Sequence, residues 1–167
     1  MLRQVQTLVG AVMGSLVIIA VVLSVAFPEG ERFEAPPLWL VGAQVAAAVV
    51  VHLLAESLGY RAAPLHVETD EVTARTTSGQ VFTSRTIVRM ALCESIALAS
   101  VAVAFLVDSG GYAGVLTGAA VSLALLAVHA WPHAGPVDRT AASLERDGAR
   151  SYLREQLGLD TGPVREL

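Results

Sequence analysis

The stretch Arg89-Met-Ala-Leu-Cys-Glu-Ser-Ile-Ala-Leu98 lies in an apolar run that extends from Ile87 to Val107. A run of about 20 apolar residues is long enough to cross the hydrocarbon layer of a membrane as a helix. Glu94 lies inside this run, and a charged side chain within a membrane span costs about 2.5–3.5 kcal/mol to insert. The stretch therefore predicts a membrane fold and, within it, a candidate functional residue.

Three further apolar runs have a similar length. Together the four runs predict membrane-spanning helices at residues 8–27, 38–58, 87–107 and 112–131. Continuous apolar runs without alternation favour helices, because a span must satisfy its own backbone hydrogen bonds. We predict an all-α fold with a four-helix transmembrane bundle over residues 1–136 and a cytoplasmic tail over residues 137–167.

The composition supports a membrane protein and excludes several other classes. Of the 167 residues, 54% are hydrophobic and 16% are charged, whereas soluble domains contain about 25% charged residues. The net charge of −4 and the absence of a basic stripe argue against nucleic-acid binding. The single cysteine, Cys93, excludes an intramolecular disulfide and any multi-cysteine metal site.

The arginines predict the orientation of the chain in the membrane. All 11 basic residues are arginine, and ten of them lie at the termini or near the loop between the second and third spans, leaving only Arg32 on the other side. An excess of arginine marks the cytoplasmic side. We therefore expect both termini to be cytoplasmic, and the lysine-free composition to indicate a multi-pass protein of the bacterial cytoplasmic membrane.

The loop before the third span has two interpretations. Thr77 and Gln80 fit a capping box, which would start the third helix below the membrane. Ser78-Gly79 between Thr-rich segments would instead fit a hairpin turn. We favour the helix, because residues 81–88 continue directly into the apolar run.

Weaker apolar periodicity continues into the tail. Val137, Ala141 and Leu144, followed by Tyr152 and further leucines, form an apolar stripe beside charged residues. Because a glycine at position 148 interrupts the stripe, we expect one amphipathic helix or two that pack on the inner face.

Small residues spaced four apart allow membrane helices to approach closely. The pairs with this spacing include Gly10 and Gly14, Ala91 and Ser95, and Gly114 and Gly118. They predict a tightly packed bundle that associates with itself or with a larger membrane complex.

Four ionisable residues form the candidate site: Glu94, His52, Glu56 and His129. At 1.5 Å per residue, Glu94 and His52 lie about 10 Å from the inner ends of their helices, so we expect them to pair. Glu56 and His129 would form a shallower tier, and Arg89 would extend its guanidinium to the interface.

Three interpretations of these residues remain open. The first is a structural hydrogen bond between helices, the second is a site that handles protons or cations, and the third is a metal site formed by all four residues. Because no tight ligand motif is present, we predict no metal and no cofactor. Motifs of nucleophilic, zinc-dependent or phosphate-binding enzymes are also absent, so we predict that the protein is not an enzyme.

The run Ala91-Leu-Cys-Glu-Ser-Ile-Ala-Leu98 resembles the carboxylate-bearing helix of the proteolipid c subunit of rotary ATP synthases. This resemblance implies an ion-binding role for Glu94. The arginine-flanked third helix and arginine-rich tail are similar to small four-helix membrane proteins of actinobacteria, which implies the architecture and no activity.

The sequence thus predicts a structural or accessory component of a membrane assembly, with the lipid bilayer and a membrane complex or second copy as partners. The alternative is a small membrane protein that handles protons or cations through an intramembrane pair of Glu94 and His52.

Overall fold

The computed structural model describes residues 1–30 and 34–159, and these residues form helices and loops without a strand. In chain order the elements are α1 (Leu2–Ala26), α2 (Leu38–Leu54), the π-helix η1 (Ala55–Gly59), α3 (Glu71–Ala104), α4 (Gly111–His129), α5 (Ala134–Leu144) and α6 (Leu153–Gln156). Four of these helical segments are long and apolar enough to cross a membrane: α1, α2 with η1, α3 and α4. The all-helical class is therefore confirmed, and the described helices have the length and composition that a multi-pass membrane protein needs.

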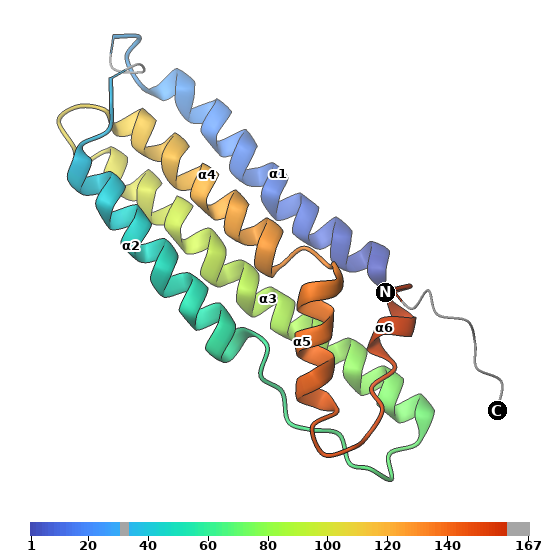
Figure 1. The fold of residues 1–167 in the computed structure, drawn as a ribbon. Helices are drawn as coiled ribbons and strands as arrows, with labels where there is room; N and C mark the ends of the chain where they lie inside the picture. The colour runs from blue at the N-terminus through green and yellow to red at the C-terminus, as the bar shows by residue number, and fades with distance from the viewer. Residues whose placement is uncertain (31–33, 160–167) are drawn as a thin grey trace.

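The four long helices form a bundle around an antiparallel pair, α3 and α4 (Figure 1). Helix α1 packs mainly on α4, whereas α2 packs on both α3 and α4. At one end, α3 continues past the other three long helices and lies beside α5 and α6 (Figure 1). We call residues 71–86 of α3 together with α5 and α6 the cap.

The beginning of α3 differs from the predicted capping box. The helix starts at Glu71, and the Asp70 carboxylate caps it by accepting a hydrogen bond from the Thr73 amide at 3.0 Å. Thr77 and Gln80 therefore lie inside the helix, and the hairpin alternative is wrong. Nearby threonine hydroxyls donate to carbonyls one turn earlier, as Thr83 does to Gly79 at 2.9 Å, which lets a Thr-rich segment remain helical.

The cap and the bundle share one apolar core. Its buried members include Val9 of α1, Cys93 of α3, Leu126 of α4, Val137 of α5 and Leu153 of α6. The tail thus forms two short helices that pack on the end of the bundle, interrupted near Gly148 as expected. Residues 160–167, which the tail prediction included, lie outside the described residues, as does Arg32.

Only some of the predicted small-residue pairs lie where two helices of the bundle are in close contact. A Cβ added at Gly118 would lie 2.1 Å from Ser100 Oγ, and one at Gly114 would lie 2.6 Å from Leu40, so both glycines allow close helix packing. By contrast, a Cβ at Gly10 or Gly14 would meet nothing within 4 Å. Ala91 and Ser95 are exposed on the outer side of α3, so α3 packs through other residues within the chain.

A buried amide joins three helices near the end of the bundle that carries the loop between α3 and α4. Gln44 of α2 is 4% exposed and donates to Ser100 Oγ at 2.9 Å and to the Gly114 carbonyl at 2.8 Å. Its own carbonyl oxygen accepts a hydrogen bond from Thr117 at 2.8 Å. Gln44 was not among the predicted site or packing residues, although a lone amide in an apolar run is a signal for an interhelical hydrogen bond.

Candidate functional site

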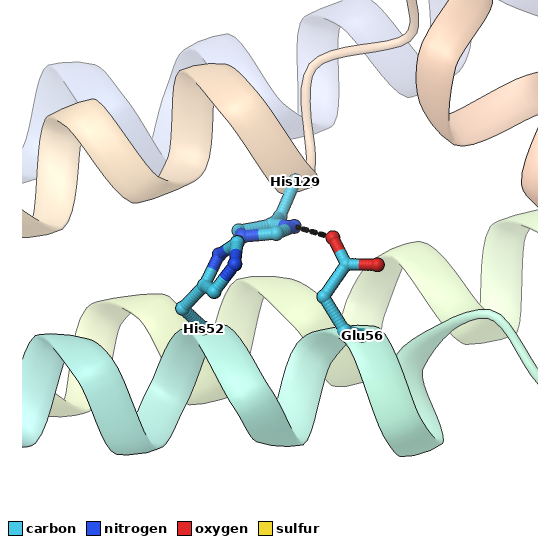
Figure 2. Close-up of side chains that lie close together, drawn as sticks. All are labelled: His52, Glu56 and His129. Carbon is cyan, nitrogen blue, oxygen red and sulfur yellow. Dashed lines mark hydrogen bonds and ion pairs between the residues drawn. The ribbon is translucent and has the colours of Figure 1, made fainter.

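Three of the four predicted site residues meet at the cap end of the bundle. His52 lies near the end of α2, Glu56 in η1, and His129 at the end of α4, and Figure 2 shows their side chains directed towards one another. One potential ligand atom from each residue lies within 4.8 Å of the others. The fourth residue, Glu94, does not belong to this group.

His129 is the centre of the site. It is fully buried, and its Nε2 atom lies 2.9 Å from Nδ1 of His52. On the other side of the ring, Nδ1 lies 2.9 Å from the Tyr60 hydroxyl and 3.8 Å from Oε1 of Glu56. Both ring nitrogens of His129 therefore have a partner, as a buried imidazole requires.

Glu56 connects the site to the cap. Its carboxylate is 36% exposed and forms an ion pair with Arg139 of α5. The Arg139 guanidinium also lies over the Tyr60 ring, 5.1 Å from the ring centroid. An ion pair this exposed contributes little stability, typically 0.2–1 kcal/mol, so the link between Glu56 and Arg139 is easily exchanged.

Arg89 holds the end of η1 in place beside the site. Arg89 of α3 is fully buried and donates to the Gly59 carbonyl at 2.7 Å and to Thr86 Oγ1 at 2.8 Å. Its guanidinium lies 4.5 Å from the centroid of the Tyr60 ring. The prediction that Arg89 extends to the interface is therefore wrong, because the end of η1 supplies a carbonyl and an aromatic face within the protein.

Glu94 does not pair with His52 as expected. It is half-buried on α3 and makes no hydrogen bond or ion pair with the other residues that the structure describes. The two residues were matched by depth alone, and depth does not determine the direction in which a helix presents a side chain. His52 instead contacts His129 across the interface of α2 and α4.

Tyr60 keeps its proton at neutral pH. Burial raises the pKa of this phenol, and the positive charges of Arg89 and Arg139 offset only part of that increase. The neutral hydroxyl can donate a hydrogen bond to His129 or accept one from it, and the tautomer of the imidazole decides which. The site thus combines two imidazoles, one carboxylate and one phenol, a set suited to interhelical bonding or cation binding.

The site is completed by three residues that were not among the predicted site residues: Tyr60, Arg89 and Arg139. One signal was present for Tyr60, since residues 52, 56 and 60 follow one another at the spacing of a helical face. Arg139 carried no such signal, because its contact depends on how α5 folds back on the bundle.

Comparison with family models, with curated proteins and with solved structures finds no match. The function is therefore argued from the geometry of the chain itself.

Proposed function

We propose that this protein is an accessory component of the bacterial cytoplasmic membrane that associates with another membrane helix through α1 and holds its cap on the cytoplasmic side. The observation that carries the proposal is the open space beside Gly10 and Gly14, where an added Cβ would meet nothing within 4 Å. In lipid, small residues spaced four apart are favoured where two backbones approach closely. Among the described residues, no other helix makes use of that spacing on α1.

The position of α1 in the bundle supports the proposal. In its most apolar segment 17% of the residues are buried, compared with 39% for α3 and α4. The same helix also has exposed apolar residues, such as Val17 and Val21, that can contact lipid or a partner helix. Helix α1 therefore leaves more surface available to a partner than the two central helices do.

The distribution of arginine supports the orientation. The cap and the adjoining loops contain Arg61, Arg75, Arg139, Arg150 and Arg154 among others. A cytoplasmic cap with this charge satisfies the positive-inside rule. The accessory role then requires that the partner lie in the same membrane.

Photocrosslinking in native membranes tests the association. Because the chain contains no lysine, a photoreactive amino acid at Val17 is preferable to an amine-reactive reagent. We expect one discrete adduct, either with a second copy or with one other protein. The adduct should disappear when Gly10→Leu and Gly14→Leu fill the small-residue face.

Ala11→Leu is the matched control, since it places the same leucine side chain at an exposed position of the same helix. An adduct that survives the double glycine change, or that Ala11→Leu also removes, would argue against association through this face.

A second candidate function is proton or cation handling by Glu94. An intramembrane carboxyl group is costly and is a default functional candidate, and Glu94 has no partner among the described residues that would explain its presence structurally. In proteoliposomes this candidate predicts a pH-dependent flux that Glu94→Gln abolishes and that Glu68→Gln, outside the spans, leaves unchanged. Absence of flux in the unmodified protein would eliminate it.

A further inference from the structure

We propose that His52, Glu56 and His129 form a binding site for a divalent transition-metal ion of the zinc class. Two imidazoles and one carboxylate, with a fourth position left for water, are a donor set that zinc uses in proteins. Calcium and magnesium prefer oxygen ligands and would not select the two histidines. The proposal is independent of the accessory role, because it concerns residues of α2, η1 and α4 rather than the glycines of α1 and requires no partner.

The two histidine nitrogens that face each other fit one ion after a small adjustment. Ligand atoms on a tetrahedral zinc ion, with bonds of about 2.0–2.1 Å, lie about 3.3 Å apart. Nδ1 of His52 and Nε2 of His129 are 2.9 Å apart, so the two rings need to separate by only a few tenths of an ångström. Oε1 of Glu56 lies 3.8 Å from Nδ1 of His129, on the other side of that ring from His52. One potential ligand atom from each of the three residues lies within 4.8 Å of the others, so the Glu56 side chain must swing around the edge of the imidazole to reach an ion on Nε2.

The buried ligand is already oriented for this role. Metal-binding histidines usually donate the second ring N–H to a fixed acceptor, which sets the tautomer. With the ion on Nε2 of His129, the Nδ1 atom faces the Tyr60 hydroxyl at 2.9 Å. Tyr60 is itself held between the guanidinium groups of Arg89 and Arg139. His129 and its support are thus rigid, while the exposed His52 and Glu56 are free to close on the ion.

Two backbone features also favour a cation here. His129 is the last residue of α4, and the carbonyl end of a helix carries partial negative charge. Glu56 lies in the π-helix η1, and such single-turn insertions occur frequently at functional sites.

Arg139 would compete with a metal ion for the carboxylate of Glu56. Its guanidinium is paired with Glu56 and is 49% exposed, so it can leave the carboxylate for water at low cost. A bound ion would therefore take Glu56 from Arg139 and weaken one link between the bundle and α5. This competition predicts that Arg139→Gln strengthens metal binding, a result that a purely structural cluster would not give.

The experiment is a titration of the full-length protein in detergent with Co²⁺ and then Zn²⁺, after purification through a tag without histidine. We expect one ion per chain, visible absorption typical of four-coordinate Co²⁺, and displacement of Co²⁺ by Zn²⁺. His52→Ala and Glu56→Gln should each weaken binding by about tenfold or more, and Arg139→Gln should tighten it.

Because His129 is fully buried, its replacement risks unfolding, and the exposed ligands carry the test instead. His133→Ala and His66→Ala are the matched controls, since these are the other two histidines of the chain and lie outside the cluster. Circular dichroism without metal should be the same for every variant used.

Unchanged affinity in His52→Ala and Glu56→Gln would overturn the proposal, and so would an equal loss in His133→Ala. Weaker binding in Arg139→Gln would also contradict it, because the arginine would then be helping the ion rather than competing with it.

Discussion

The buried guanidinium of Arg89 depends on a neighbour without a side chain. Its Cγ atom lies 2.7 Å from the position that a Cβ on residue 59 would occupy, and the Gly59 carbonyl accepts its hydrogen bond. The charge is therefore buried where the backbone of η1 comes closest to α3. Arg89 also contacts the ring of Tyr60, and the Tyr60 hydroxyl in turn lies within hydrogen-bond distance of His129.

Gly59→Ala should destabilise the protein by about 1–3 kcal/mol, the usual cost of adding a methyl group to a filled interior. The added Cβ would displace Arg89 from Gly59 and disturb the ring of Tyr60. Reversible unfolding in mixed detergent would measure the change in free energy. Gly42→Ala is the control, since a Cβ there meets nothing within 4 Å; equal effects at both positions would contradict the account of Arg89.

Gln44→Met should weaken the packing of α2 on α3 and α4 without changing the fold. The change removes hydrogen bonds to α3 and α4, and interhelical hydrogen bonds in membrane proteins contribute about 0.6 kcal/mol on average and up to about 1.7 kcal/mol. We expect a loss of about 1–2 kcal/mol in the same unfolding assay. Ser95→Ala removes a hydroxyl that bonds only within its own helix and should have almost no effect. Indistinguishable results for the two variants would show that the amide is not an interhelical tie.

At the scale of elements, α6 is held to the long helix α3 by charge as well as by its apolar side. Glu155 accepts a hydrogen bond from Arg75 at 2.8 Å and is paired with Arg150. Gln156 adds a hydrogen bond from its side-chain amide to the Arg75 carbonyl at 3.1 Å. The buried side chains of Leu153 and Leu157 complete the contact.

Acidification should release α6 before the bundle unfolds. Burial acts to raise the pKa of Glu155, but the hydrogen bond from Arg75 and the charge of Arg150 outweigh it, so the pKa is lowered. The stabilisation is then fully present above the ordinary glutamate pKa of about 4.3 and is lost as the pH falls through the lowered value. Amide hydrogen exchange of residues 153–157, corrected for intrinsic rates, should show protection that is constant near neutral pH and falls in acid.

Glu155→Gln is the control for this prediction. It should lower the protection of α6 at neutral pH and remove the acid step, because no carboxylate remains at that position to be protonated. An acid step of the same size in Glu155→Gln would assign the effect to another group.

The elements differ in how far the sequence predicts them. The four spans were predictable because twenty apolar residues admit few structures in lipid, and α3 could be extended because its apolar run is continuous with residues 81–88. The N-cap at Asp70 was missed because Thr77 and Gln80 fit a capping box further along the chain. A cap signal tells where a helix can begin, whereas the fold determines where it does.

The candidate site was predictable in composition and not in pairing. His52, Glu56 and His129 were identified because ionisable residues in apolar runs are conspicuous. Their mutual contacts depend on the rotation of each helix about its axis, which no local pattern fixes. The same reason explains why Glu94 was assigned a partner that it does not contact. Arg139 was missed because its contact depends on how α5 folds back on the bundle.

At the scale of the whole molecule, the contacts among charged and histidine side chains of the described residues are concentrated at one end. His129, Arg89 and the ion pair of Glu56 with Arg139 lie where the bundle meets the cap, whereas the opposite end carries the short loop between α3 and α4 (Figure 1). The proposed accessory role places this polar end in the cytoplasm. A metal ion would then reach the site from the cytoplasm, and Arg139 would be the group that it displaces.

The most direct test is the accessibility of two single cysteines in a Cys93→Ala background, treated with a membrane-impermeant maleimide. Ser109 lies in the exposed loop between α3 and α4, and Asp147 lies in the exposed loop between α5 and α6. In spheroplasts, we expect Ser109→Cys to be labelled at once and Asp147→Cys only after the membrane is permeabilised. Immediate labelling of Asp147→Cys in sealed spheroplasts would place the cap outside and contradict the account.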